Sequence, residues 1–178
     1  MTRLNTPAVD QATGEAAALF ASVKSKVGKV PNLYATLGGN SPDVLAHVLN
    51  TGATLGRSTL SRLEQEAINL AVSEATGCDY CVAAHTMTGK LAGYSAEQTR
   101  ELRAGGFARD ARIDALVKFA LDLVNQRGTL DASAVDALKA VGFTDRQLVE
   151  IPLVVSAILF TNMVNRINDT TLDFPKVA

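Results

Sequence analysis

The sequence predicts an all-α protein, a single-domain helical bundle that spans residues 1–178, and three observations carry this prediction. Hydrophobic residues make up 47% of the 178 residues, yet aromatic residues are only 5% and tryptophan is absent. Such an aliphatic composition is typical of helical packing rather than of sandwiches or barrels. Capping-box patterns recur along the chain. No segment alternates apolar and polar residues over a useful strand length.

In the first third of the chain, helix signals predict two helices. The first covers 11–27, and the glycine- and proline-containing segment 28–32 breaks it. The second covers 42–55, because Ser41 is a suitable N-cap and Pro42 then occupies the first helical position. No linker or internal repeat divides this part of the chain from the rest.

Capping boxes mark three of the later helices. Ser61 and Glu64 form one such pattern and open a helix that runs to about residue 76, where Gly77 provides a stop. The next helix holds residues 78–91. Further helices are expected from 95 to the glycines at 105 and 106, over 110–126, over 132–141, and from 144 to 168.

The last of these helices is apolar on every side between Ile151 and Phe160. Such a stretch is buried all round, either in a core or between subunits. We favour a subunit interface, because a domain of this size seldom needs a wholly buried helix; a kink at Pro152 is the alternative explanation. The uncharged run 151–164 is shorter than the roughly 18 apolar residues that a membrane span needs.

Charge and targeting signals limit the classes of function. The 17 basic and 18 acidic residues are spread evenly, so nucleic-acid binding has little support. No apolar leader follows the N-terminus, and we expect a soluble, cytoplasmic protein that does not bind membranes. In that compartment a close cysteine pair is more often catalytic or metal-binding than a structural disulfide.

Both cysteines of the chain and one of its two histidines lie in one short segment. Cys78, Cys81 and His85 fall at i, i+3 and i+7, on one face of a helix that begins near Cys78. A helix N-terminus favours a thiolate over a thiol. His85, one turn after Cys81, is placed to transfer the proton. A second cysteine three residues away can trap an oxidised first cysteine as a disulfide.

A carboxylate can join this group only if the chain reverses near Gly77. A helical hairpin there would place Glu74 opposite Cys81, and Glu66 roughly opposite His85. Glu64 already has a role in the capping box. Helical periodicity therefore leaves Glu66 and Glu74 as equal candidates for the partner of the histidine.

Three other interpretations of the cysteine pair compete with redox catalysis. The cysteines could be small buried hydrophobic residues, or the switch of a non-enzymatic redox sensor. They could also bind a metal with His85, and Glu66 or Glu74 would then be the fourth ligand. Structural zinc sites usually use a second Cys/His pair, and the other histidine, His47, lies in a separate predicted helix. Redox thiol chemistry is therefore preferred.

The spacing from Glu66 to His85, E-x11-C-x2-C-x3-H, resembles the pattern of AhpD-like alkyl hydroperoxidases in the carboxymuconolactone decarboxylase superfamily. The flanking residues agree. They are the segments 60–66, 77–82 and 93–95, together with 30–33 and Asn165-Arg166, which resemble the peroxidase-related branch. The resemblance is strong over residues 30–95. The decarboxylase branch lacks the cysteine pair, which argues against lactone decarboxylation here.

The resemblance implies an AhpD-like all-helical fold, homo-oligomers such as trimers or hexamers, and no cofactor or metal. It also implies reduction of a hydroperoxide substrate, with electrons from a dithiol or a thioredoxin- or lipoyl-type donor. By this resemblance Cys81 is the attacking cysteine and Cys78 the resolving one, whereas helix-dipole reasoning alone favours Cys78.

The resemblance further implies that Glu66 and His85 form the proton relay. Tyr80 stands where the best-known enzymes of the family carry a histidine. A phenol that titrates near pH 10 cannot act as a base at neutral pH, although it can donate a hydrogen bond.

Overall fold

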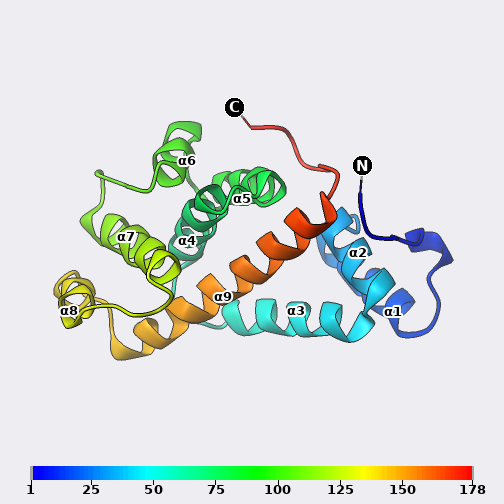
Figure 1. Ribbon diagram of the computed structural model, residues 1–178, viewed down its shortest axis with the longest axis horizontal. Helices are drawn as coiled ribbons and strands as arrows, with labels where there is room; N and C mark the ends of the chain where they lie inside the picture. Colours follow the sequence, from blue (N-terminus) through cyan, green and yellow to red (C-terminus); the bar gives the residue numbers. More distant parts are fainter. Residues whose placement is uncertain (1, 178) are drawn as a thin grey trace.

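The computed structural model describes residues 2–177, and within them it contains nine α-helices and no strand, so the prediction of an all-α fold is confirmed (Figure 1). A short 3₁₀ turn, η1 (Val9–Gln11), precedes the helices. The helices are α1 (Gly14–Val27), α2 (Asn32–Asn40), α3 (Pro42–Leu55), α4 (Arg62–Ala75), α5 (Asp79–Ala92), α6 (Ala96–Arg103), α7 (Ala111–Asn125), α8 (Ala132–Ala140) and α9 (Asp145–Asn168).

The predicted helix starts have the expected hydrogen bonds. All three capping boxes form, at Ser61, Ser95 and Thr144, where each hydroxyl accepts from the backbone N–H three residues later. Pro42 opens α3 as expected, although the Ser41 side chain makes no capping bond. The capping rules therefore located the helices on both sides of the cysteine segment.

Helix α2 is the one α-helix that the sequence analysis does not predict. Its two adjacent glycines, Gly38 and Gly39, are poor helix formers. Tertiary packing explains the helix instead: a Cβ built on Gly38 would lie only 2.5 Å from a ring carbon of Phe20 and 2.7 Å from Leu45. The glycine lets α1, α2 and α3 approach closely, and this packing outweighs the low propensity.

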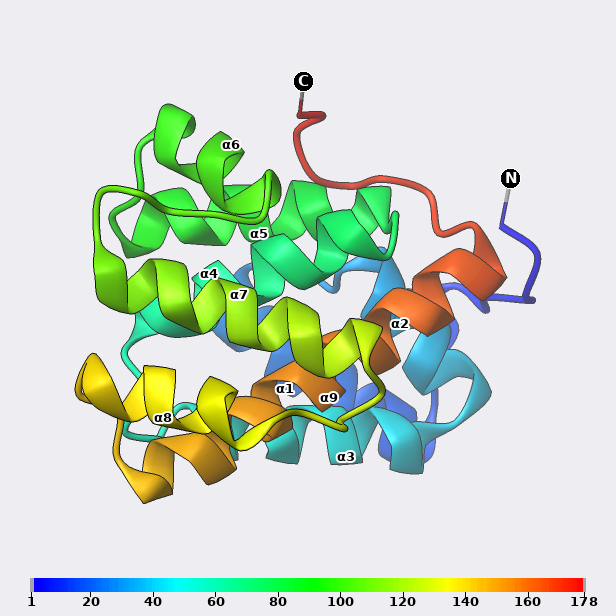
Figure 2. The same cartoon turned by 60° about the vertical axis from the view of Figure 1, so that its left-hand side comes forward.

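The long helix α9 crosses the molecule between α3 on one side and α4–α7 on the other (Figures 1 and 2). Helix α4 packs against α5, α6, α7 and α9 and is the centre of the bundle. The core around it consists mainly of buried aliphatic side chains. Helix α4 therefore offers fixed positions for side chains that belong to a site.

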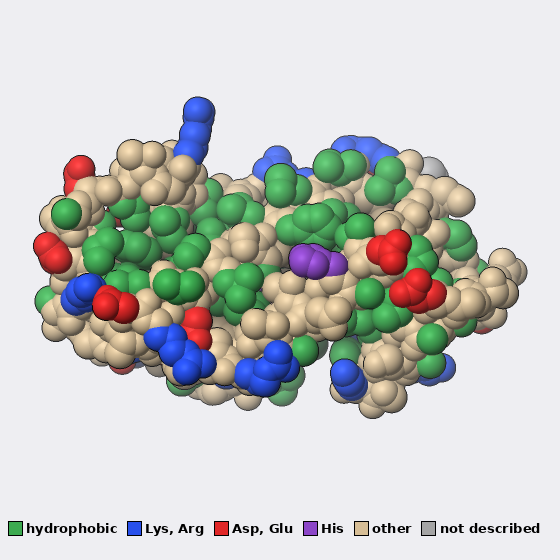
Figure 3. Space-filling view, turned by 90° about the horizontal axis from the view of Figure 1, so that it is seen from below, with side chains coloured by type: hydrophobic (Ala, Val, Ile, Leu, Met, Phe, Trp, Pro, Cys, Tyr) green, Lys and Arg blue, Asp and Glu red, His purple; other side chains and the backbone are tan. Residues whose placement is uncertain are grey.

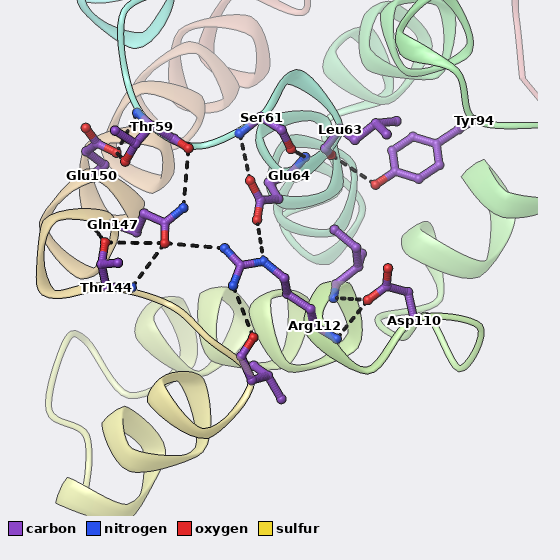
Figure 4. Close-up of polar contacts among 12 residues, drawn as sticks. Thr59, Ser61, Leu63, Glu64, Tyr94, Asp110, Arg112, Thr144, Gln147 and Glu150 are labelled. Atoms are coloured by element: carbon purple, nitrogen blue, oxygen red, sulfur yellow. Dashed lines mark hydrogen bonds and ion pairs between the residues drawn. The ribbon is translucent and has the colours of Figure 1, made fainter.

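A polar cluster fixes the first turn of α4, and Figure 4 shows its contacts. Nε of Arg112 donates to Oε1 of Glu64 at 2.9 Å, while Glu64 also accepts from the backbone of Ser61. The same guanidinium donates to the carbonyl of Val141 and to Gln147 at the start of α9. We call Ser61, Glu64, Arg112 and Gln147 the Arg112 cluster. It ties together the segments that begin α4, α7 and α9.

The expectation that the stretch 151–160 is buried all round is wrong for the chain by itself. Ile151, Val154, Val155 and Ile158 are buried in the core, but Leu153 and Phe160 are only partly buried. By length and composition alone α9 is long and apolar enough to cross a membrane, the only such helix among residues 2–177. Because one face of α9 packs into the core, a core helix accounts for this composition equally well.

Candidate functional site

The site is built on the hairpin formed by α4 and α5. Gly77 adopts a left-handed conformation, with a φ of 67°, and the chain reverses there. Cys78 is the N-cap of α5, and its sulfur accepts from the backbone N–H of Cys81 at 3.3 Å. The reversal lays α5 back along α4, so that His85 lies beside Glu66, as the hairpin argument predicts.

Cys78 and Cys81 are joined as a disulfide, with Cα atoms 5.3 Å apart. Both residues are buried, with exposed fractions of 1% and 3%. Their surroundings differ: Nδ2 of Asn165 donates to the sulfur of Cys81 at 3.2 Å, and Cys81, not Cys78, lines the main cavity. An N–H directed at a sulfur stabilises its thiolate form when the pair is reduced.

Glu66 is fully buried and has three partners. Its Oε2 lies 2.8 Å from Nδ1 of His85 and accepts from the Thr88 hydroxyl at 2.9 Å. Its Oε1 forms an ion pair with Arg62 at 2.7 Å, although the two are not aligned as a hydrogen bond. A carboxylate that accepts from Nδ1 fixes the histidine tautomer, which leaves Nε2 as the ring atom able to accept a proton.

The electrostatics of the site keep Glu66 ionised. Burial by itself raises the pKa of the Glu66 carboxyl. The charge of His85 and its hydrogen bond, followed by Arg62 and Thr88, more than offset that effect, so the pKa lies below its ordinary value. Glu66 is therefore a permanent negative charge beside the imidazole at neutral pH.

A cavity of about 800 Å³ opens between α3, α4, α5 and α9, and both Cys81 and His85 line it. Most of its other lining side chains are apolar, and they include Leu33, Val44, Val48, Leu55, Leu153 and Phe160. His47 of α3 also reaches this cavity, so both histidines of the chain line the same space. Figure 3 shows hydrophobic side chains gathered over the face that is seen from below the view of Figure 1.

Tyr80 is held by the C-terminal segment rather than by the sulfurs. Its hydroxyl donates to Asp173 at 2.7 Å and accepts from the backbone N–H of Leu33 at 3.2 Å. The ring of Phe174 packs edge-on against Tyr80, with centroids 5.3 Å apart. Burial is the main cause that raises the pKa of Tyr80 far above its ordinary value. The hydroxyl is therefore not a base, and its contacts fasten residues 173–174 over the start of α5.

The two candidate glutamates differ in which residue they contact. Glu66 meets His85, whereas Glu74 forms an ion pair with Arg103 near the surface. Arg62 and Asn165 are site residues that the sequence analysis misses. Arg62 lies one helical turn before Glu66, a spacing that could have identified it. Asn165 reaches Cys81 only through tertiary packing, and no local pattern signals such a contact.

The described part of the chain contains no group of donor side chains that matches a metal site. Among residues 2–177, no three side chains of the types His, Cys, Asp and Glu are grouped so that they could hold a metal ion. In particular, the Nδ1 atom of His85 is turned toward Glu66, within hydrogen-bond distance. The side chains considered as metal ligands instead form a histidine–carboxylate pair, His85 and Glu66, beside the Cys78–Cys81 disulfide.

Comparison with known proteins finds a family model that matches the region of this hairpin. Residues 42–111, which include the whole spacing pattern from Glu66 to His85, match the carboxymuconolactone decarboxylase family. Over this stretch the chain is similar to that family. No curated protein matches the chain.

Solved structures with the same fold include AhpD-like proteins. An uncharacterized peroxidase-related protein from Ralstonia eutropha JMP134, described as an alkylhydroperoxidase AhpD core, is 22% identical, with a TM-score of 0.87 over 97% of this chain and 92% of that one. An uncharacterized peroxidase-related protein from Silicibacter sp. TM1040 is 26% identical, with a TM-score of 0.82 over 96% and 91%. The fold is therefore AhpD-like.

One further structure of this fold has a bound aromatic compound. The debrominase Bmp8 in complex with 2,3,4-tribromopyrrole is 16% identical to this chain, with a TM-score of 0.76 over 97% of this chain and 94% of that one. At this level of identity the likeness concerns the fold alone.

Proposed function

We propose that the protein is a dithiol-dependent peroxidase that reduces organic hydroperoxides through the Cys78–Cys81 pair. The observation that carries the proposal is that Cys81 lines the same cavity as His85, whose Nδ1 contacts the buried Glu66. Nucleophile, base and the group that orients the base are the parts that an activated thiol requires. The similarity of residues 42–111 to the carboxymuconolactone decarboxylase family supports an enzymatic role for this arrangement.

The proposed cycle starts from the reduced pair. The Cys81 thiolate attacks the terminal oxygen of the hydroperoxide, the O–O bond breaks, and the alkoxide leaves as an alcohol after it takes up a proton. Cys81 is then a sulfenic acid. The Cys78 thiolate attacks the Cys81 sulfur, water leaves, and the disulfide forms. Overall, the hydroperoxide gains two electrons from the two thiols, and the products are an alcohol, water and a disulfide.

Each polar group of the site has a role in this cycle. His85 takes the Cys81 proton at Nε2 and returns it to the departing alkoxide, while Glu66 stabilises the imidazolium that exists between these steps. The amide N–H of Asn165 lowers the energy of the thiolate. Oδ1 of Asn165 is buried without a hydrogen-bond partner among the described residues, so it can accept from a substrate O–H.

A reductant must regenerate the thiols after each turnover. A dithiol is the suitable class, because thiol–disulfide exchange at Cys78 or Cys81 returns both electrons in two attacks. We therefore propose a small dithiol, or a thioredoxin- or lipoyl-type protein, as the electron donor.

The test measures hydroperoxide consumption, with cumene hydroperoxide and hydrogen peroxide as substrates and dihydrolipoamide or thioredoxin as donor. The proposal expects turnover by the wild-type protein and loss of turnover in both Cys81→Ser and Cys78→Ser. Ser73→Ala is a matched control, because it removes a buried polar atom of α4 outside the cavity. Absence of turnover with every donor, together with a redox-dependent change in assembly, would instead indicate a non-enzymatic sensor.

Reductive dehalogenation of an aromatic compound is a second candidate. The cavity of about 800 Å³ is far larger than a peroxide group requires and is mostly apolar. The same dithiol could supply two electrons and a proton that convert a carbon–bromine bond to carbon–hydrogen, with release of bromide and a further proton. Bromide release from 2,3,4-tribromopyrrole in the presence of a dithiol measures this activity directly. Bromide release without hydroperoxide turnover would favour it.

A further inference from the structure

The cavity that Cys81 and His85 share holds a large part of the chain's few aromatic side chains. The chain has six phenylalanines, three tyrosines and no tryptophan. Four of these nine residues, Tyr34, Tyr80, Phe160 and Phe174, line the cavity, although its lining comprises only 29 of the 178 residues. Aliphatic side chains suffice to enclose an apolar space, whereas aromatic rings pack best, edge-on or offset, against another ring. The lining therefore favours a ligand that carries a ring.

Three of the four aromatic residues lie together beside the sulfur of Cys81. Tyr80 directly precedes Cys81 in α5, and the ring of Phe174 meets the Tyr80 ring edge-on, at 80° and with centroids 5.3 Å apart. Burial is the main cause that raises the pKa of Tyr80, and the phenol of Tyr34 adds to it, so Tyr34 is a neighbour of the same side chain. We call Tyr34, Tyr80 and Phe174 the aromatic box.

The carboxylate of Asp173 fixes the box in place. It accepts from the Tyr80 hydroxyl, from the backbone N–H of Asn32 at 3.2 Å and from Nζ of Lys29 at 3.0 Å. The same Nζ lies over the Phe174 ring, 4.6 Å from its centroid. Because these contacts already hold the rings, a ligand that enters the box needs to order little of the protein, which favours its binding.

A polar group for the other end of the ligand lies next to the box. Asn165 is 3% exposed and lines the cavity, and its Nδ2 donates to the Cys81 sulfur. Its Oδ1 is buried without a hydrogen-bond partner among the described residues, which is costly unless a ligand supplies a donor. The O–H of a hydroperoxide is such a donor, and a hydrogen bond to Oδ1 would hold the terminal oxygen close to the sulfur that attacks it.

We propose that the substrates are aryl-alkyl hydroperoxides, in which a single carbon joins the ring to the O–OH group. The ring occupies the aromatic box, the O–H donates to Oδ1 of Asn165, and Phe174 is a specificity-determining residue. A single carbon fits because the box borders Cys81 directly. An apolar cavity of about 150 Å³ already holds benzene, so a cavity of about 800 Å³ has room for a substituted ring. The reacting group rests on the proposed peroxidase function, whereas recognition of the ring does not.

The first test compares two peroxides that differ only in the ring, cumene hydroperoxide and 2-cyclohexyl-2-propyl hydroperoxide. The saturated ring buries at least as much apolar area, so hydrophobicity alone gives the aryl compound no advantage. The proposal expects kcat/KM to be at least fivefold higher for cumene hydroperoxide, after division by the rates of the two peroxides with dihydrolipoamide alone. Turnover of both peroxides without this preference would overturn the inference and leave the peroxidase function intact.

Variants assign the preference to the box. Phe174→Leu removes the ring but keeps an apolar side chain, and it should lower the ratio of the two kcat/KM values at least threefold. Phe174→Tyr keeps a ring and should retain the ratio. Phe119→Leu is the matched control, because Phe119 is buried in α7 outside the cavity. Circular dichroism verifies that each variant is folded. An unchanged ratio in Phe174→Leu, or an equal fall in Phe119→Leu, would overturn the role of the box.

The second test measures binding without turnover. Calorimetric titration of the disulfide form with 2-phenyl-2-propanol and 2-cyclohexyl-2-propanol should show at least fivefold tighter binding of the aryl alcohol, lost in Phe174→Leu. The methyl ether of the aryl alcohol has no O–H for Asn165 and should bind at least threefold more weakly. Equal binding of the two alcohols would contradict ring recognition. Ring-selective binding without turnover of either peroxide would keep the box and refute the peroxidase, so the two failures are distinguishable.

Discussion

Helix α4 carries two buried glutamates, Glu64 and Glu66, and the difference between their surroundings is the reason why we propose a catalytic role for Glu66 alone. Glu64 accepts from the Ser61 backbone and from Arg112, so its charge is used entirely to hold helices together. Glu66 also has an arginine partner, but its other oxygen contacts His85, and it faces the cavity. Burial and an arginine are thus common to both; the histidine and the access to a cavity belong to Glu66 alone.

The largest expected effect tests this contrast with the same isosteric change at both positions. Glu66→Gln should lower kcat/KM for hydroperoxide at least 100-fold, because general acid–base catalysis contributes about 10²–10⁴-fold and the amide cannot balance the imidazolium. Glu64→Gln should leave the activity per folded molecule unchanged. Steady-state assays of the two variants measure the contrast, and equal losses at both positions would remove the functional distinction between them.

The next effect concerns stability, where the contacts of Glu64 should matter most. Arg112→Ala removes the partner of Glu64 and the contacts to Val141 and Gln147, at a cost of about 2 kcal/mol, or a fall in Tm of about 4–8 °C for a chain of this length. Lys118→Ala removes an exposed ion pair with Asp114 and should change the stability by less than about 0.5 kcal/mol. Thermal unfolding measures both. A smaller loss for Arg112→Ala than for Lys118→Ala would show that the Arg112 cluster does not stabilise the bundle.

A third, smaller effect distinguishes two buried asparagines of α9. Asn165 donates to the Cys81 sulfur, whereas Asn162 donates to the Thr76 hydroxyl. In the reduced protein Asn165→Ala should raise the pKa of the Cys81 thiol by about one unit, since a hydrogen bond to a charged group contributes about 1.5–3 kcal/mol. Asn162→Ala should not change it. The pH dependence of thiolate absorbance gives both values, and a shift of the same size in both variants would assign it to general loosening of α9.

The smallest effect is the pH dependence of stability that arises from Glu66. Its pKa in the folded chain lies below the ordinary value of 4.5. A lowered pKa means that the ionised carboxylate stabilises the fold above about pH 4.5, and that this contribution is lost as the pH falls through the folded-state pKa. Between pH 6 and 3, the wild-type protein should therefore lose more free energy of unfolding than Glu66→Gln does. Urea titrations at each pH measure the free energy of unfolding. Equal losses in the wild-type protein and in Glu66→Gln would show that Glu66 is not the source of the pH dependence.

Local patterns predicted most of the fold and the centre of the site. Capping boxes located α4, α6 and α9, because their hydrogen bonds involve residues three positions apart. The reversal at Gly77 predicted that Glu66 could reach His85. These are contacts within one helix end or one hairpin, which a short stretch of sequence encodes completely.

Contacts between distant segments were beyond the reach of such patterns. Helix α2 exists because Gly38 fits between Phe20 and Leu45, although its own propensity is low. Asn165 contacts Cys81 across 84 positions of the chain. The helix dipole alone favoured Cys78 as the reactive thiol, but only the packing of α3 and α9 determines which sulfur lines a cavity. The full burial of Glu66, which helical periodicity did not distinguish from Glu74, also depends on tertiary packing.

The central claim is that Cys81 attacks the substrate from the cavity and that Cys78 resolves the product. The most direct measurement treats reduced Cys78→Ser protein with one equivalent of cumene hydroperoxide, traps sulfenic acid with dimedone and locates the label by mass spectrometry. The proposed mechanism predicts the label on Cys81, formed at least tenfold more slowly when Glu66→Gln is added. Absence of label on Cys81, or equally fast labelling of Cys78 in the Cys81→Ser protein, would contradict it.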